Sequence, residues 1–262
     1  MRANGLREAW AEDRAALGGW LTIASGFSAE IMAHSGFDWV CVDMQHGVID
    51  YAQMVVMLQA VSGTAVTPLV RVPWNEPGII GKTLDAGARG VIIPMVNTRA
   101  EAEQAVWSCR YAPAGGRSYG PLRANYSVGF DYFEHANDDV LCIVMIETRD
   151  AVGRLDEILS VPGIDAVYIG PADLSITLGL APAPDHDESV FTAAIAQILD
   201  ACRKHGVVPG IAGNQKTAPM RIEQGFRLVE VASDARLLGI GAGEALHAVA
   251  PDGSATARSA YL

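Results

Sequence analysis

The sequence predicts a single α/β domain folded as a (β/α)8 barrel, or TIM barrel. Three observations support this fold class. The chain has 262 residues, and one such barrel needs about 250. Eight short apolar runs alternate with longer helical patterns. Each run is apolar throughout, which is typical of parallel strands buried on both faces.

The expected strands cover residues 19–24, 39–43, 67–72, 90–94, 141–147, 166–170, 207–212 and 228–232. Helical patterns cover residues 28–35, 51–62, 76–86, 98–109, 148–159 and 187–205. Some of these carry cap signals: Thr98 with Glu101 forms a candidate capping box, and Gly206 follows the longest helix. A doubly wound open sheet is the competing architecture. Eight strand–helix units with no GxGxxG after any strand favour the closed barrel.

Two segments depart from this alternation. Residues 110–139 form a long insert before the fifth strand, rich in glycine, arginine and aromatic residues. A connection this long without regular structure is usually functional or packs on a partner subunit. Residues 251–262 are small and polar. We therefore expect a barrel domain over residues 1–250, followed by a flexible C-terminal tail.

Composition narrows the class of protein. Half of the residues are hydrophobic and the net charge is -11, which supports a large core and argues against a nucleic-acid or anionic-membrane partner. No segment has the pattern of a signal peptide or a membrane span. The four cysteines are scattered in apolar patterns without CxxC spacing. We interpret them as reduced thiols of a cytoplasmic protein.

Polar residues lie at or just after the ends of four expected strands: Asp43, Arg71, Glu147 and, after Gly170, Asp173. In this fold the carboxyl ends of all strands meet at one rim, where barrel enzymes place their chemistry. Glu147 and Asp173 are 26 residues apart, about one strand–helix unit. Two carboxylates with open positions suit a hard divalent cation. The alternative is that each one only caps the following helix.

His46 and Arg71 are further candidates at this rim. A histidine just past the second strand could act as a general base, although a lone loop histidine is more often structural. Arg71 ends an apolar strand, where it needs an anionic partner: Asp43, Asp85 or a substrate oxygen. From spacing alone, Asp85 is a solvated helix residue. No lysine ends a strand, which argues against a Schiff-base mechanism.

Five segments together carry a family resemblance: FDWVCVDMQHG, PLVRVPWNEPGIIGKTLDAGARGVIIPMV, RYAPAGGRSYG, IETRDAV and GIDAVYIGPADLSITLG. They resemble the class II, metal-dependent pyruvate aldolases typified by 4-hydroxy-2-oxoheptanedioate aldolase, which include the 2-keto-3-deoxy sugar acid aldolases. The resemblance runs from about residue 18 to residue 238, nearly the whole barrel.

The resemblance implies a role for each candidate. Glu147 and Asp173 would ligate a divalent metal (Mg²⁺, Mn²⁺ or Co²⁺) that acts as a Lewis acid on a 2-oxo acid. Arg71 would stabilise the enolate oxygen. His46 would be the general base, with Asp85 raising its basicity. The reaction would be the reversible cleavage of a 4-hydroxy-2-oxo acid into pyruvate and an aldehyde.

The same resemblance implies a substrate site and an assembly. The backbone at Ala172, next to Gly170, would bind the substrate carboxylate, and a homo-oligomer, usually a hexamer, is expected. Two positions depart from the family pattern. Met145 stands where many members have glutamine, and Gln45 where many have glutamate. Because Met145 removes a hydrogen-bonding group near the metal, the donor is left open between pyruvate and hydroxypyruvate.

Two alternatives lie outside the aldolase hypothesis. An enzyme of the citrate-lyase or malyl-thioester kind would share the barrel and the metal, but the sequence shows no basic patch for coenzyme A phosphates. A catalytically silent barrel acting as a binding module is the other. The intact set of His46, Arg71, Glu147 and Asp173 argues against it.

Overall fold

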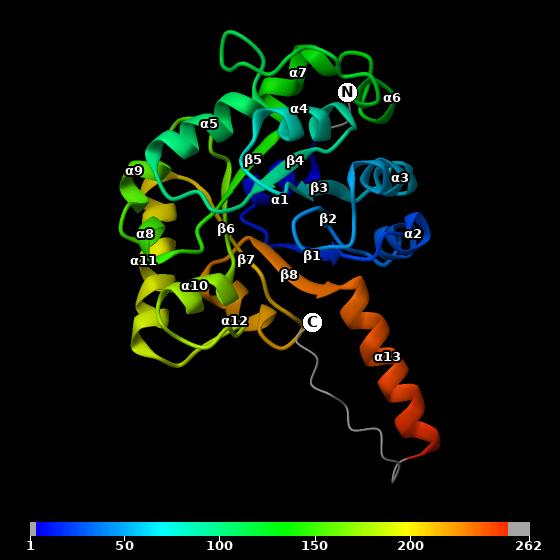
Figure 1. Cartoon of the computed structure of the whole chain (residues 1–262), viewed down its shortest axis with the longest axis vertical. Coiled ribbons are helices and arrows are strands. Elements are labelled where there is room, and N and C mark those ends of the chain that lie inside the picture. The colour runs from blue at the N-terminus through cyan, green and yellow to red at the C-terminus, as the bar shows by residue number, and fades with distance from the viewer. Residues whose placement is uncertain (1–3, 251–262) are drawn as a thin grey trace.

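A computed structural model describes residues 4–250 of the chain. It shows a closed barrel of eight parallel strands in sequential order, surrounded by helices (Figure 1). The strands are β1 (Ala16–Leu21), β2 (Trp39–Asp43), β3 (Thr67–Arg71), β4 (Gly90–Ile93), β5 (Leu141–Met145), β6 (Ala166–Ile169), β7 (Val208–Ile211) and β8 (Leu228–Ser233). The predicted (β/α)8 barrel is confirmed, and every expected strand overlaps an observed one.

The helices are α1 (Gly5–Ala11), α2 (Gly26–Ala33), α3 (Tyr51–Val61), α4 (Pro77–Asp85), α5 (Arg99–Cys109), α6 (Ala124–Ser127), α7 (Tyr132–Asp139), α8 (Arg149–Val152), α9 (Leu155–Leu159), α10 (Pro171–Thr177), α11 (Ser189–His205), α12 (Ala218–Gln224) and α13 (Asp234–Val249). The helix expected over residues 148–159 is split into α8 and α9, with Gly153 ending the first. Thr98 caps the start of α5 as expected, because its hydroxyl accepts from the Glu101 amide. The Glu101 carboxylate accepts from the Asn97 amide instead of the Thr98 amide, so the expected capping box is displaced by one residue.

The insert over residues 110–139 is not structureless, because it contains α6 and α7. Arg117 anchors it: this buried guanidinium donates to the Asp85 carboxylate at 2.7 Å and to the Tyr132 hydroxyl at 2.9 Å. It also stacks on the Tyr111 ring, 4.5 Å from the centroid. These contacts tie the insert to the end of α4.

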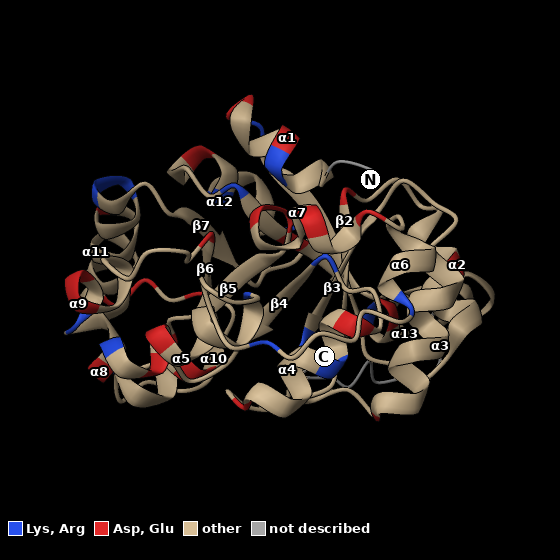
Figure 2. Cartoon of the chain, turned by 90° about the horizontal axis from the view of Figure 1, so that it is seen from above, with Lys and Arg blue, Asp and Glu red and all other residues tan. Residues whose placement is uncertain are grey.

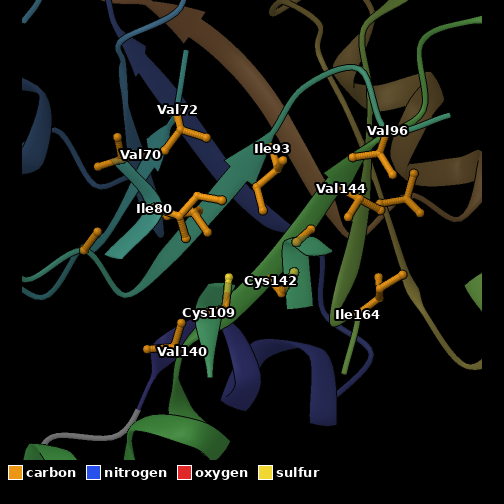
Figure 3. Packing of buried hydrophobic residues seen from close by; sticks show 14 of the residues in the cluster. Val70, Val72, Ile80, Ile93, Val96, Cys109, Val140, Cys142, Val144 and Ile164 are labelled. Carbon is orange, nitrogen blue, oxygen red and sulfur yellow. The ribbon is translucent and has the colours of Figure 1, made fainter. Parts of the chain in front are cut away.

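Two apolar layers hold the barrel together. The interior cluster includes Trp20, Trp39 and Met145, and α1 closes the amino-terminal end of the barrel by adding Leu6 and Ala9. The outer layer packs the strands against the helices, and Figure 3 shows part of it around β3, β4 and β5. Burying each large apolar side chain contributes about 1.5–3 kcal/mol, so these layers fix the rim from which the loops project.

The surface has two further features. Acidic and basic residues are interspersed around the outer helices rather than segregated on one side (Figure 2). Helix α13 extends away from the barrel (Figure 1) and exposes Leu238, Leu246 and Val249. Among residues 4–250, no helix combines the length and apolar character needed to cross a membrane. The tail expected over residues 251–262 lies outside the described residues.

Candidate active site

The carboxyl ends of β2, β3, β5 and β6 bring polar side chains to one rim of the barrel. Asp43 and Arg71 are the last residues of β2 and β3 and are register partners. Glu147 lies two residues beyond β5, and Asp173 lies in the first turn of α10, just beyond β6. The sequence therefore predicted correctly that these four residues share one end of the barrel.

Glu147 is the best-defined of the four. Its side chain is buried, and its Oε1 accepts a hydrogen bond from the Met95 amide at 2.8 Å. Met95 has a φ of 57°, a left-handed conformation that costs a non-glycine residue about 1–2 kcal/mol. A Cβ at Gly170 would lie 2.6 Å from Glu147 Oε2. The glycine is thus required for Glu147 to lie against the β6–α10 turn.

Helix capping does not account for either carboxylate. The side-chain cap of α8 is Thr148, which accepts from the Ala151 amide. The N-cap residue of α10 is Gly170, and α10 has no side-chain cap hydrogen bond. Both Glu147 and Asp173 are therefore left for another role.

The electrostatics of Glu147 and Asp173 fit a cation. Burial raises the pKa of Glu147 to about 7, the Met95 amide and the Arg71 charge lower it, and the Asp173 charge raises it further. A divalent cation between the two would relieve the repulsion that the Asp173 charge exerts on an ionised Glu147. No cluster of three or more acidic, histidine or cysteine ligands occurs in the described residues. Other ligands would then be water and substrate oxygens.

Arg71 is held in a defined orientation. Its Nε and Nη2 donate to the two oxygens of Asp43 at 2.8 Å and 2.6 Å. Its guanidinium carbon lies 4.5 Å from the centroid of the Trp20 ring. We call this paired contact of two guanidinium nitrogens with one carboxylate a fork. It leaves Arg71 Nη1 without a hydrogen bond to any residue of the described chain, so Nη1 is available to bind an anionic oxygen.

His46 lies in the exposed turn after β2. Its backbone amide donates to Asp43 Oδ1 at 3.3 Å, as the Gln45 amide does at 3.0 Å. The imidazole makes no hydrogen bond within residues 4–250 and faces solvent. Asp43 thus connects His46 and Arg71; its pairing with Arg71 was one of the partners expected from the sequence, whereas its contact with the His46 amide was not.

Asp85 is not brought to His46 within one chain. It is the last residue of α4, and only four residues separate it from the start of β4 at Gly90. It therefore lies toward the amino-terminal rim, whereas His46 follows the carboxyl end of β2. Its carboxylate is paired with Arg117 at 2.7 Å. The contact expected between Asp85 and His46 is absent from the described chain for this topological reason.

Two of the residues expected to bind substrate, Met145 and Gly170, lie close to Glu147. Met145 is buried, and a Cβ at Gly170 would lie 3.1 Å from its terminal methyl group. Ala172 is in the first turn of α10, where backbone N–H groups have no acceptor within the helix. The Met145 methyl group and the first turn of α10 therefore meet at Gly170, next to Glu147.

A buried acid that was not predicted from the sequence is Glu230 of β8. Its Oε2 accepts from the Gly213 amide at 3.2 Å and from the Tyr168 hydroxyl at 3.5 Å. Burial raises its pKa to about 7, while Arg236 and Arg71 lower it. A glutamate inside the apolar run LVEVA was the available signal, because an acid in the interior of a barrel has to be compensated.

Glu230→Gln is expected to stabilise the protein more at high pH than at low pH. A carboxyl whose pKa rises from 4.5 to about 7 on folding destabilises the folded protein little below pH 4.5, progressively more between pH 4.5 and about 7, and by a constant amount at higher pH. The gain of Glu230→Gln over wild type should therefore be about 2 kcal/mol larger at about pH 8.5 than at about pH 5.5. Denaturant unfolding of both proteins at matched concentration, with EDTA, measures this difference. A gain independent of pH would contradict the assigned pKa.

Comparisons with known proteins give the relatives of the chain. The family model described as HpcH/HpaI aldolase/citrate lyase matches residues 17–239. The chain is 43% identical over 236 residues to a hydroxypyruvate/pyruvate aldolase of Rhizorhabdus wittichii, covering 90% of this chain and 94% of that protein. It is 41% identical over 249 residues to a 4-hydroxy-2-oxo-heptane-1,7-dioate aldolase of Salmonella dublin, covering 94% of each. An HpcH/HpaI aldolase/citrate lyase family protein from Burkholderia cenocepacia superposes with a TM-score of 0.87 at 33% identity, over 94% of this chain and 99% of that one.

Proposed function

Because the chain belongs to the HpcH/HpaI aldolase/citrate lyase family and is a carbon–carbon lyase of the aldolase type, we propose that it cleaves 4-hydroxy-2-oxo acids. The cleavage is reversible and gives pyruvate or hydroxypyruvate and an aldehyde. The observation that carries this proposal is the placement of a buried Glu147 beside Asp173, at the same rim as an Arg71 whose fork is fixed by Asp43.

Glu147 and Asp173 would hold a divalent cation: Mg²⁺, Mn²⁺ or Co²⁺. When bound, such a cation supplies Lewis-acid polarisation of the 2-oxo group. The backbone of Ala172, beside Gly170, binds the donor carboxylate. These contacts fix the donor so that its C3 lies within the rim.

Arg71 stabilises negative charge in this reaction, and His46 accepts a proton. Arg71 Nη1 donates to the oxygen that becomes negative as the C3–C4 bond breaks, and its orientation is set in advance by Asp43 and Trp20. The His46 imidazole accepts the proton of the 4-hydroxyl group in the cleavage direction. The exposed position of His46 keeps the aldehyde side of the site open to solvent.

The assignment of Asp85 and the expected homo-oligomer are proposed together. Since Asp85 lies toward the opposite rim and is paired with Arg117, it can raise the basicity of His46 only from a second copy of the chain. A hexamer, or another closed assembly, would provide that copy. The exposed aromatic residues of the insert, Tyr126 and Phe130, supply apolar surface for such a contact.

A cytoplasmic location is proposed from the cysteines. All four are buried free thiols, as expected in a reducing compartment.

Met145→Gln is expected to shift donor preference toward hydroxypyruvate. Met145 places an apolar methyl group beside Gly170, where an amide could hydrogen-bond the extra hydroxyl group of hydroxypyruvate. We expect the ratio of kcat/KM for hydroxypyruvate over pyruvate to rise about tenfold, a difference of about 1.4 kcal/mol. Met145→Leu, which adds no hydrogen-bonding group, is the matched control. An unchanged ratio in Met145→Gln would remove Met145 from the donor site.

The proposed function is tested by incubating the protein with Mg²⁺, Mn²⁺ or Co²⁺, a donor (pyruvate or hydroxypyruvate) and a panel of aldehydes. We expect donor and aldehyde to be consumed together, and consumption to stop with EDTA. Consumption that continues in EDTA would refute the metal-dependent mechanism. Turnover only of acyl-thioester substrates would replace the aldolase with a thioester lyase.

A further inference from the structure

A chain of buried polar groups crosses the barrel interior beneath the rim. The indole of Trp20, from β1, donates through Nε1 to the Tyr168 hydroxyl of β6 at 2.9 Å. Tyr168 is fully buried and lies 3.5 Å from Glu230 Oε2 of β8. The three residues come from strands that are far apart in the sequence. Trp20 and Tyr168 belong to the interior cluster, which is otherwise largely apolar.

The direction of these hydrogen bonds is determined by chemistry. An indole N–H can only donate, so the Tyr168 oxygen must accept from Trp20. The single proton of Tyr168 is then directed to Glu230, which also accepts from the Gly213 amide. Burial raises the pKa of Tyr168 well above its ordinary value, and the hydroxyl therefore remains a donor. Glu230 thus orients Tyr168, and Tyr168 orients the indole.

At the Trp20 end, this series of hydrogen-bonded side chains reaches the candidate active site. The Trp20 ring lies against the guanidinium of Arg71, with 4.5 Å between the guanidinium carbon and the ring centroid. Asp43 restrains two nitrogens of Arg71 in the plane of the fork. The indole restrains the tilt of that plane, because a guanidinium stacks on an aromatic face. The direction of Nη1 therefore depends on the orientation of Trp20.

We propose that Tyr168 and Glu230 are positioning residues for Arg71, acting through the indole of Trp20. This inference rests on the proposed aldolase function. A buried acid in a barrel core is costly unless it is compensated, and here it fixes the arginine that stabilises negative charge. Catalysis is sensitive to small misplacements of such a group.

Tyr168→Phe and Glu230→Leu test the proposal. Each substitution interrupts the hydrogen bonds that link Glu230, Tyr168 and Trp20. Each is expected to lower kcat about tenfold while changing KM for the donor less than about twofold. Glu230→Gln keeps an oxygen that accepts from Tyr168 and Gly213, so it should stay within about twofold of wild type. Ser108→Ala removes a buried hydroxyl on α5 that bonds the Gln104 carbonyl. It controls for the loss of any buried hydrogen bond.

A double-mutant comparison separates positioning from general destabilisation. In an Arg71→Lys background the fork is already lost, so Tyr168→Phe and Glu230→Leu should each lower kcat less than about twofold further. A tenfold loss in both backgrounds would overturn the proposal. So would wild-type kcat in both single variants, or a loss in Glu230→Gln equal to that in Glu230→Leu.

A spectroscopic measurement adds a readout that does not depend on turnover. In protein labelled with ¹⁵N-tryptophan, the Trp20 indole resonance is identified by its loss in Trp20→Phe. We expect this resonance to move in Tyr168→Phe and to stay in place in Ser108→Ala. An unmoved resonance would contradict the Trp20–Tyr168 hydrogen bond and overturn the proposal. An inactive wild-type protein would instead indicate that the proposed function itself is wrong.

Discussion

Glu147→Gln is expected to lower kcat/KM about 10³-fold, which corresponds to about 4 kcal/mol of transition-state stabilisation. Glutamine has nearly the same shape and can still accept from the Met95 amide. It lacks the charge that would hold a cation with Asp173. Initial rates over a range of Mg²⁺ concentrations measure the effect, and the variant should show no saturable response to the metal.

This loss should not arise from unfolding. Burial and the neighbouring Asp173 raise the pKa of Glu147 to about 7, so the ionised side chain destabilises the folded protein at neutral pH. Removing the charge should therefore leave the metal-free protein at least as stable as wild type. Asp150→Asn, three residues away on the exposed surface of α8, is the matched control and should keep wild-type activity. Near-normal activity in Glu147→Gln would contradict the assigned metal site.

Arg71→Lys is expected to lower kcat about 10²-fold, within the range found when one donor to a developing negative charge is removed. Lysine keeps a positive charge beside the buried Asp43. It cannot occupy both carboxylate oxygens and also direct a third nitrogen into the site. Steady-state kinetics with a saturating aldehyde should show the loss mainly in kcat rather than in KM for the donor.

The chain contains a matched control for this substitution. Arg89 and Asp139 form a second buried fork, with Nε and Nη2 at 2.7 Å and 2.6 Å from the carboxylate oxygens. This pair precedes β4 and β5 and so lies at the opposite rim. Arg89→Lys should cost similar stability but leave kcat unchanged. Equal losses of kcat in the two variants would indicate that Arg71 acts only through folding.

Much of the fold could be predicted from the sequence because each strand is buried on both faces. The bounds predicted for β2 match the observed strand, and the other strands differ by a few residues at their ends. The 16-residue helix α13 was not predicted. Neither were two short helices, α10 and α12. Both helices carry proline in the first turn, a position that proline favours because its missing N–H is not needed there.

The site was predicted less completely than the fold. The positions of Glu147 and Asp173 followed from strand order, since parallel strands all end at one rim. The Met95 amide could not be predicted, because it depends on a left-handed loop residue with no glycine to signal it. The Trp20–Tyr168–Glu230 chain joins three strands across the barrel interior. Only the closed structure shows which inward-facing residues meet.

The central claim is that Glu147 and Asp173 together hold the divalent cation on which the reaction depends. Exchange of the C3 protons of pyruvate or hydroxypyruvate with D2O, followed by proton NMR, tests it most directly because no aldehyde is needed. We expect rapid exchange for wild type with Mg²⁺. We expect only the uncatalysed rate with EDTA, in Glu147→Gln and in Asp173→Asn. Exchange at the wild-type rate in EDTA and in both variants would show that these two residues do not hold a metal needed for the reaction.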